Sequence, residues 1–302
     1  MSNISKRIKI ELCKFNLTNK LITDRSIEIH KKKIYQIENF YNEKLKFFSP
    51  LDFKYLYSNQ YDSCHIWGSG STADITKNFV KYEKNFFHIG FGFSCLLDID
   101  FNFYFIENAS KKNLDFLKVQ NNALNKFIDN KKTILAFKNL WQEKNDMDLA
   151  YETYKDKALF IRDLIIPHYN ASDFAINNTI NKLLYDDPNY FRESCSSIIT
   201  SIIFAKFLGF KKIVLHGVDF YGDYFFDKES YIKEYSEFIP PHVKNVYDKK
   251  WRNSQNKHPT ANCLEVILPK LRDKLKINHN IELLTASKIS GSIKHLNSFF
   301  ND

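Results

Sequence analysis

Short runs of consecutive apolar residues recur between residues 62 and 285, and segments with helical spacing lie between several of them. Such runs are typical of strands buried on both faces, and their alternation with helices predicts a Rossmann-like α/β fold, a mostly parallel sheet with helices on both faces. The predicted strands are Ser63–Trp67, Phe86–Ile89, Phe103–Ile106, Thr133–Phe137, Ala158–Ile161, Ile213–His216 and Ile281–Leu284.

The first sixty residues follow a different pattern. Apolar and polar residues alternate in Arg7–Phe15 and in Ser26–His30, which predicts two half-exposed strands. We therefore expect an accessory N-terminal extension, a main domain with a small lid subdomain, and a short C-terminal tail. Their expected bounds are 1–60 for the extension, 61–285 for the main domain, 222–257 for the lid and 286–302 for the tail.

Composition narrows the class of protein. The 302 residues carry 44 Lys+Arg against 35 Asp+Glu, a formal charge of +9 that favours an anionic partner without saying which. No window reaches the ~18 apolar residues of a membrane-spanning helix, and the N-terminus lacks a signal peptide, so we expect a cytoplasmic protein. The five cysteines are scattered without CxxC spacing, which argues against a disulfide framework and a zinc site.

A glycine-rich turn, Gly68-Ser-Gly-Ser71, follows the predicted strand Ser63–Trp67. Glycines let the backbone approach a phosphate or ribose, and the following helix offers free N–H groups. The turn does not complete GxGxxG, and the next predicted strand, Phe86–Ile89, ends without an acid to hold a ribose, so a nicotinamide cofactor is disfavoured. A tight turn without a ligand explains the motif equally well.

A second unit supplies the other side of a crevice. Serines in the segment 192–197 cap a predicted helix over residues 198–208, and the next strand ends at Gly217-Val-Asp-Phe-Tyr221. In open α/β sheets, ligands bind beyond the carboxyl ends of the strands. We therefore expect Gly68–Ser71, Asn108 and Gly217–Tyr221 to face one crevice.

Three side chains suit phosphate binding and proton transfer. The phenols of Tyr221 and Tyr224 can hydrogen-bond a phosphate without a metal, although tyrosines that only pack a surface are common and the chain has 17. His258 precedes a predicted helix, Ala261–Leu275, and is a candidate general base, although any one of nine histidines is more often an ordinary surface or core residue. No Asp-x-Asp pair precedes a candidate donor site, and no His/Glu spacing resembles a metal centre, so we expect no metal and no cofactor.

The order and content of these motifs resemble the bacterial sialyltransferases of glycosyltransferase family 42 over roughly residues 62–285. The family's Gly-Asn-Gly-Pro-Ser loop corresponds to Gly68-Ser-Gly-Ser-Thr72, and its Asn-Pro-Ser step corresponds to Asn108-Ala-Ser110. Its Arg-Ile-Thr-Ser-Gly helix start corresponds to Arg192-Glu-Ser-Cys-Ser196.

The resemblance continues after the second unit. The family's Gly-Ile-Asp-Phe-Tyr strand end is nearly repeated by Gly217-Val-Asp-Phe-Tyr221, its Ser-Tyr-Ala-Phe-Asp segment corresponds to Asp223-Tyr-Phe-Phe-Asp227, and its catalytic histidine falls on His258. Two donor-side asparagines of the family are replaced, one by Ser69 and one near Gly90. The donor sugar is therefore left open among sialic acid, Kdo, legionaminic acid and pseudaminic acid.

The resemblance implies inverting, metal-independent transfer of such a sugar from its CMP donor to a cell-surface glycan acceptor, as in lipopolysaccharide, lipooligosaccharide or capsule biosynthesis. Tyr221 and Tyr224 would bind the CMP phosphate, Asn108 would contact the donor, and His258 would act as the base. Ser194 and neighbouring N–H groups would receive the donor carboxylate, a role that also suits a helix N-terminus. The other implied site residues are Arg192 as a catalytic residue and Gly68, Ser69, Gly70, Ser71, Cys195, Ser196, Gly217 and Asp219 as substrate-binding residues.

Two alternatives differ in class. The replaced donor-side positions would also suit an idle glycosyltransferase-like protein that binds a nucleotide sugar or glycan. The charge and aromatic content suit a nucleic-acid-binding protein, but no helix-turn-helix, zinc finger or RNP-type motif supports that reading. The charge would also help the enzyme to dock, as a peripheral protein, on an anionic acceptor at the inner membrane. The acceptor, the linkage and any homo-oligomer are left open.

Overall fold

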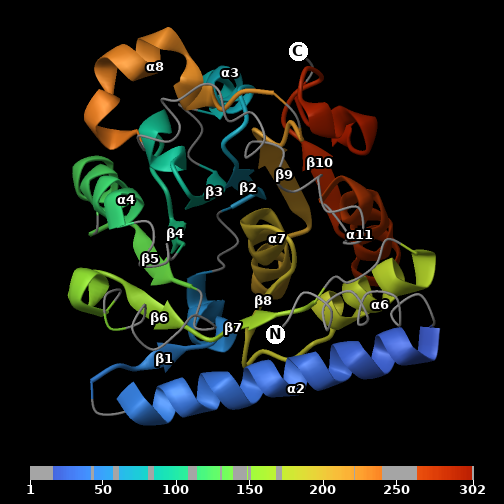
Figure 1. Cartoon of the computed structure of the whole chain (residues 1–302). Coiled ribbons are helices and arrows are strands. Elements are labelled where there is room, and N and C mark those ends of the chain that lie inside the picture. Colours follow the sequence, from blue (N-terminus) through green and yellow to red (C-terminus); the bar gives the residue numbers. More distant parts are fainter. Residues whose placement is uncertain are drawn as a thin grey trace, which may run out of the picture.

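The computed structural model describes residues 16–41, 44–56, 61–80, 85–107, 114–129, 131–138, 148, 151–167, 172–220, 222–239 and 264–300. Within these residues, nine parallel strands form one sheet in the order β1-β6-β5-β4-β3-β2-β9-β10-β11 (Figure 1). Their bounds are β1 Phe47–Phe48, β2 Ser63–Trp67, β3 Phe86–Phe91, β4 Phe103–Ile106, β5 Ile134–Phe137, β6 Leu159–Ile161, β9 Lys212–His216, β10 Glu282–Thr285 and β11 Asn297–Ser298. A separate parallel pair joins β7, Asp163–Ile165, to β8, Phe191–Glu193.

The helices lie on both faces of the sheet, as the sequence predicts. In Figure 1, α4 and α8 lie on one side of the strands, and α7 and α11 lie on the other. The helices are α2 Asn16–Tyr41, α3 Ala73–Val80, α4 Leu114–Phe127, α6 Asp173–Leu184, α7 Ser197–Leu208, α8 Glu229–Glu234 and α11 Leu264–His279. Short 3₁₀ turns cover Pro50–Leu56, Ser94–Leu97, Phe225–Asp227, Ser236–Phe238 and Gly291–Lys294.

The strand order has a switch point between β2 and β9. From β2 the chain builds β3, β4, β5 and β6 in one direction, and β9, β10 and β11 extend the sheet in the other. After β2 and β9, the chain therefore leads away in opposite directions at the same edge of the sheet. Open α/β sheets bind ligands at such a point.

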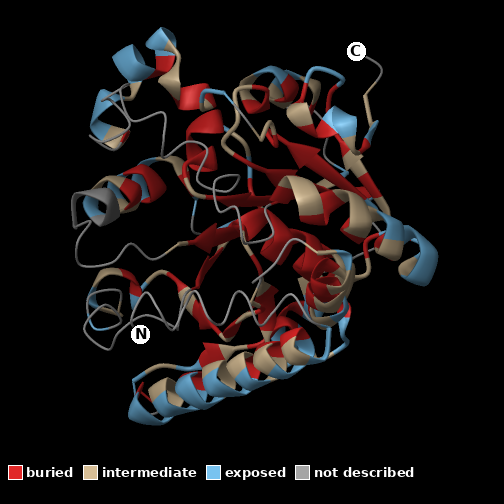
Figure 2. Ribbon diagram, turned by 45° about the vertical axis from the view of Figure 1, so that its right-hand side comes forward, coloured by how far each residue is buried: buried red, intermediate tan, exposed pale blue. Residues whose placement is uncertain are grey.

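The central elements form the core, shown in red in Figure 2. All five residues of β2 are buried, and ten of the twelve residues of α7 are buried as well. A helix that is apolar all round must be enclosed by other elements, as α7 is. No helix among the described residues is long and apolar enough to cross a membrane.

The fold class and the seven predicted strands are confirmed, with shifts of one or two residues at their ends. The predicted strand Ser26–His30 is wrong, because these residues lie inside α2. The buried face of α2 includes Ile27, Ile34 and Tyr41, which recur at helical spacing. The segment Arg7–Phe15 lies outside the described residues, as do residues 240–257 of the expected lid.

The sheet also extends past both boundaries that we expected from the sequence. Phe47 and Phe48 of the N-terminal segment pair with Phe160 and Ile161 of β6. At the other end, β11 pairs with β10. Two strands, β1 of the expected extension and β11 of the expected tail, are therefore part of the sheet.

A chain of histidine hydrogen bonds crosses the centre of this sheet. The Nδ1 atom of His65 lies 2.8 Å from Nε2 of His216, and Nδ1 of His216 lies 2.9 Å from the Thr76 hydroxyl. Because that hydroxyl donates to backbone carbonyls, it accepts from His216, and His65 must then donate to His216. Both rings are fully buried and neutral, and burial lowers their pKa well below the ordinary value, with repulsion among the histidines adding to the effect.

We predict that acid weakens the fold through these histidines. A buried neutral histidine with a lowered pKa binds fewer protons than the unfolded chain, so its contribution is present above the ordinary value of 6.5 and is lost as pH falls. Burial lowers the pKa of His88 to about 4. Between pH 6.5 and 4 we expect the free energy of unfolding, measured in urea, to fall by up to about 1.4 kcal/mol per pH unit for each histidine.

The variant His88→Asn tests the assignment to particular rings. The Trp67 indole donates to His88 Nδ1 at 3.1 Å, and an asparagine carbonyl offers an acceptor that does not titrate. This variant should show a shallower acid slope than the wild type. Equal slopes in the two proteins would contradict the prediction.

Candidate functional site

The turns after β2 and β9 touch backbone to backbone. The Gly68 N–H donates to the His216 carbonyl at 2.8 Å, and the Gly70 N–H donates to the Gly217 carbonyl at 2.9 Å. A Cβ atom at Gly70 would lie 2.7 Å from that carbonyl oxygen, and Gly217 adopts φ +60°. Glycine is therefore required at these positions because a side chain would force the two turns apart.

The Asp219 carboxylate ties the turns together. It accepts from the Thr72 N–H at 2.9 Å and from the Thr72 hydroxyl at 2.6 Å, and the Ser71 hydroxyl lies 3.5 Å away. From the C-terminal segment, the Ser290 hydroxyl donates to it at 3.0 Å. Asp219 thus lines the predicted crevice, but protein donors occupy its oxygens.

The segment after β9 packs against the same turn. The Phe225 N–H donates to the Ser69 carbonyl at 3.0 Å, and Tyr224 forms a β-bridge with Gly70. The ring of Tyr224 stacks on Phe226 with centroids 5.0 Å apart. Tyr224 is therefore held at the glycine-rich turn.

These turns enclose a pocket of about 250 Å³ at the switch point of the sheet. It opens beyond the carboxyl ends of β2, β3, β4 and β9 and beside the first turn of α7. The described lining residues are Gly68, Ser69, Gly70, Phe91, Gly92, Glu107, Ser196, Ser197, Ile198, Gly217, Val218, Asp219, Phe220, Gly222, Asp223, Tyr224 and Leu264. Ser71 is not among them. Within the described part of the chain, no group of three His, Cys, Asp or Glu side chains could hold a metal ion.

The start of α7 differs in detail from the prediction. Ser196 is its N-cap, and the Ser196 hydroxyl accepts from the Ile198 N–H at 3.2 Å. Ser194 is fully buried and Cys195 adopts φ +53°, because the chain turns tightly before the helix. The pocket is therefore lined by Ser196 and Ser197, whereas Ser194 and Cys195 do not line it.

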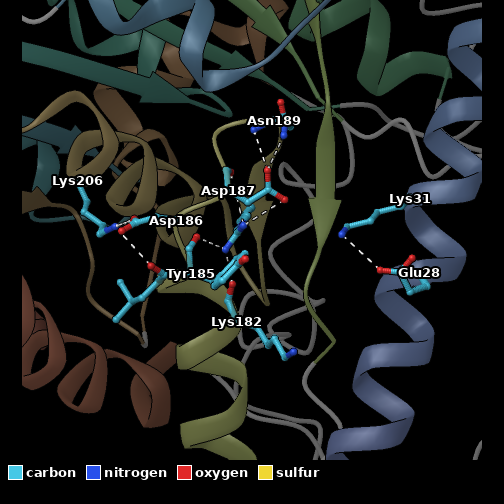
Figure 3. A network of polar contacts seen from close by, with 10 residues as sticks. Glu28, Lys31, Lys182, Tyr185, Asp186, Asp187, Asn189 and Lys206 are labelled. Carbon is cyan, nitrogen blue, oxygen red and sulfur yellow. Dashed lines mark hydrogen bonds and ion pairs between the residues drawn. The ribbon is translucent and has the colours of Figure 1, made fainter.

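Arg192 is also directed away from the pocket. Its guanidinium donates to the carbonyls of Lys182, at 2.6 Å, and of Tyr185, and it forms an ion pair with Asp187 at 3.6 Å. Figure 3 shows these partners in the network between α6 and β8. Arg192 is 4% exposed, and burial lowers its pKa. Successive residues of a strand point to opposite sides, so Glu193 faces the pocket side and the predicted catalytic Arg192 holds the α6–β8 connection.

Sequence reasoning missed a buried polar cluster behind the pocket. Lys138, directly after β5, donates to Glu193 at 2.5 Å and to the Ser197 hydroxyl at 2.6 Å. The Ser197 hydroxyl donates to Glu107, which directly follows β4 and lines the pocket. The available signal was the position of Glu107 and Lys138, each the first residue after an apolar run.

Three of the predicted site residues lie outside the described residues. They are Asn108, Tyr221 and His258. Tyr221 is bracketed by the pocket residues Phe220 and Gly222, and Asn108 follows Glu107. Their roles stay predictions.

Comparisons with known proteins found distant structural matches. No family model and no curated protein matches the sequence. A variant of the sialyltransferase CstII in complex with CMP matches with a TM-score of 0.48 and 17% identity, covering 79% of this chain and 87% of that one. CstII from Campylobacter jejuni in complex with the substrate analogue CMP-3FNeuAc matches with a TM-score of 0.43 and 16% identity, over 80% of this chain and 87% of that one. A CstII mutant described as an alpha-2,3/8-sialyltransferase matches with a TM-score of 0.43 and 15% identity, covering 79% of this chain and 87% of that one.

We predict that Asp219 is needed for the stability of the fold as well as for the shape of the pocket. Hydrogen bonds to a charged group contribute on the order of 2 kcal/mol, and Asp219→Ala leaves the donors of Thr72 and Ser290 without this acceptor. We expect at least that loss in urea unfolding, with Asp219→Asn in between. The control Asp273→Ala removes an exposed carboxylate paired with Arg272 and should cost less than about 0.5 kcal/mol. Equal stability of Asp219→Ala and the control would show that the hydrogen bonds of Asp219 do not stabilise the fold.

Proposed function

We propose that this protein is an inverting, metal-independent glycosyltransferase that transfers a carboxylated sugar, sialic acid or a relative, from its CMP donor to a glycan acceptor. The observation that carries the proposal is the convergence of three sequence motifs on one pocket. Gly68–Gly70, Ser196–Ser197 and Gly217–Tyr224 are far apart in the chain, yet each contributes to the lining. The first and third of these segments, and Ser196 of the second, belong to the motifs in which the family 42 resemblance is found.

The chemistry of the lining suits a phosphorylated, carboxylated ligand. The glycine-rich turn brings backbone close to the pocket without a Cβ, which suits a phosphate or a ribose. At the first turn of α7, the Ser196 hydroxyl accepts from the Ile198 N–H and can donate its own proton to a carboxylate, a ligand that suits a helix N-terminus. Tyr224 lines the pocket in the segment after β9, and its phenol can hydrogen-bond a phosphate.

The proposed reaction is a single displacement. His258 removes the proton from the acceptor hydroxyl as its oxygen attacks the anomeric carbon, and CMP leaves from the opposite face. Tyr221 and Tyr224 stabilise the charge that grows on the departing phosphate, a task that many sugar-nucleotide enzymes give to a metal. The acceptor is proposed to be a lipid-linked or lipopolysaccharide-type glycan at the inner membrane, which the formal charge of +9 helps to bind.

One observation bears on the alternative, an idle nucleotide-sugar-binding protein. At Gly90, where the resemblance would place an asparagine, a Cβ atom would lie 2.6 Å from the Tyr104 ring and 2.7 Å from Phe101. The rings occupy the space of that side chain, so any donor is held differently on this side. Detectable hydrolysis of a CMP-sugar would exclude the idle protein.

The first functional prediction concerns the nucleotide. CMP should raise the thermal midpoint, and UDP, GDP and NAD should not, because a ligand that binds only the native state stabilises it. At a concentration of 100 times Kd the gain is about 2.7 kcal/mol. EDTA should leave transfer unchanged. A strict Mg²⁺ requirement, or equal shifts with all four nucleotides, would contradict the proposal.

The second concerns the base. His258→Ala should lower transfer by roughly 10²–10⁴-fold while CMP affinity stays nearly constant, because a base acts on the acceptor proton in the transition state. The wild-type rate should fall on the acid side as His258 protonates, and this limb should be missing from the residual rate of the variant. Joint loss of CMP binding and thermal stability would instead make His258 a structural residue.

A further inference from the structure

The buried cluster behind the pocket contains more acid than base. Lys138 is 1% exposed and faces three carboxyl groups, those of Glu193, Glu107 and Asp163. Burial opposes the charge of Lys138, but attraction to these three acids outweighs it and raises the pKa of the lysine. Lys138 therefore stays charged, and one positive charge must balance three acids.

The lysine is not shared equally. Its Nζ atom lies 2.5 Å from Glu193 and 3.5 Å from Glu107, and the hydroxyl of Ser197 bridges Lys138 to Glu107. Burial raises the pKa of Glu107 above its ordinary value; Lys138 offsets part of that rise and repulsion by Glu193 adds to it. Lys138 thus lies closer to Glu193 than to Glu107, and the raised pKa of Glu107 favours its protonated form.

Two residues of this cluster, Glu107 and Ser197, line the ligand pocket, and Glu107 is the acid among them. Its side chain is 35% exposed, whereas those of Glu193 and Lys138 are 17% and 2% exposed. It lies beside Ser196 and Ser197 at the first turn of α7, where the proposed function puts the carboxylate of the donor sugar. An ionised Glu107 would repel that carboxylate.

The other charged groups that the structure describes around the pocket do not relieve this repulsion. Among the described lining residues, the charged side chains are Glu107, Asp219 and Asp223, and Tyr224 is the remaining titratable group. Arg192, next to Glu193 on β8, donates to backbone carbonyls on the other side of that strand. The described side chains that carry charge around a carboxylate bound at the start of α7 are therefore all acids, and Glu107 is the one beside that helix turn.

We propose that Glu107 takes up a proton from solvent when the donor binds, so that a neutral carboxyl group hydrogen-bonds the carboxylate of the donor sugar. The inference rests on the proposed function, and it makes recognition of a carboxylated sugar dependent on pH. Ser197 and Lys138 orient the carboxyl group, and its O–H points to the ligand. CMP alone, which has no sugar carboxylate, needs no such proton.

Calorimetry on the full chain tests this with two ligands, CMP and the 3-fluoro analogue of CMP-N-acetylneuraminic acid. Titrations in buffers of different ionisation enthalpy, at pH values above the pKa of free Glu107 and above the second phosphate pKa of CMP, about 6, should show up to one proton taken up per analogue bound and none for CMP. In that range the Kd of the analogue should rise by up to about tenfold per pH unit. The Kd of CMP should change much less.

Two variants separate protonation from a structural role. Glu107→Gln mimics the neutral carboxyl, so the analogue should bind with a Kd near the wild-type value at low pH, without proton uptake and with little pH dependence. Glu193→Gln removes the acid that competes for Lys138, so Lys138 pairs with Glu107 alone and lowers its pKa. The affinity for the analogue should then begin to fall at a lower pH than in the wild type. Glu152→Gln, at an exposed surface position, is the matched control and should behave like the wild type.

The outcomes are distinguishable. If CMP and the analogue both fail to bind the folded wild type, the proposed function fails first. If CMP binds and the analogue binds without proton uptake, the inference about Glu107 is wrong while the function stands. Weaker binding of the analogue to Glu107→Gln at every pH would also overturn it, because Glu107 would then be an ionised acceptor for sugar hydroxyls. A variant that fails to fold leaves the wild-type proton count as the deciding measurement.

Discussion

The contact between the turns after β2 and β9 is the constraint on which the rest of the site depends. Their backbones approach so closely that Gly68, Gly70 and Gly217 leave no room for side chains. The Asp219 carboxylate then fixes the pair by accepting from Thr72 on one side and from the C-terminal segment on the other. The C-terminal segment is held as tightly, since a Cβ atom at Gly291 would lie 2.0 Å from the Asp219 carbonyl oxygen.

This arrangement determines what kind of ligand the pocket can hold. Because Asp219 is occupied by protein donors, the floor of the pocket presents backbone, small side chains and hydroxyls. On the opposite wall, α7 is enclosed on nearly all sides, so its first turn cannot move far relative to the strands. The site is therefore rigid on two sides before a ligand arrives, which lowers the ordering cost of binding.

The sequence predicted the parts of this site that have a local signal. An apolar run followed by glycine marks β2 with its turn, and serines before an apolar run with Gly209 after it mark α7, whose C-cap glycine adopts φ +100°. The predicted strand Ser26–His30 was wrong because its apolar residues alternate as in a strand. The burial of Ile27 depends instead on α6 and β7, which pack against α2. The expected place of Arg192 in the pocket was wrong for a related reason. A three-residue strand carries no periodic pattern, so the side to which Arg192 points is set by pairing with β7.

The charge of the site could not be derived from the charge of the chain. A formal net charge of +9 suggests a basic pocket for an anionic ligand, yet the charged lining residues that the structure describes are acids. Two buried cations that the structure describes are already paired, Arg192 with carbonyls and Asp187, and Lys138 with Glu193. Coulomb interactions fall off within about 10 Å at ordinary ionic strength, so surface lysines steer an anion toward the protein but do not hold it in the pocket. Among the described residues, N–H and O–H groups are the donors left for an anion in this pocket. Under the proposal for Glu107, its protonation decides whether that acid is a donor or a repulsive charge.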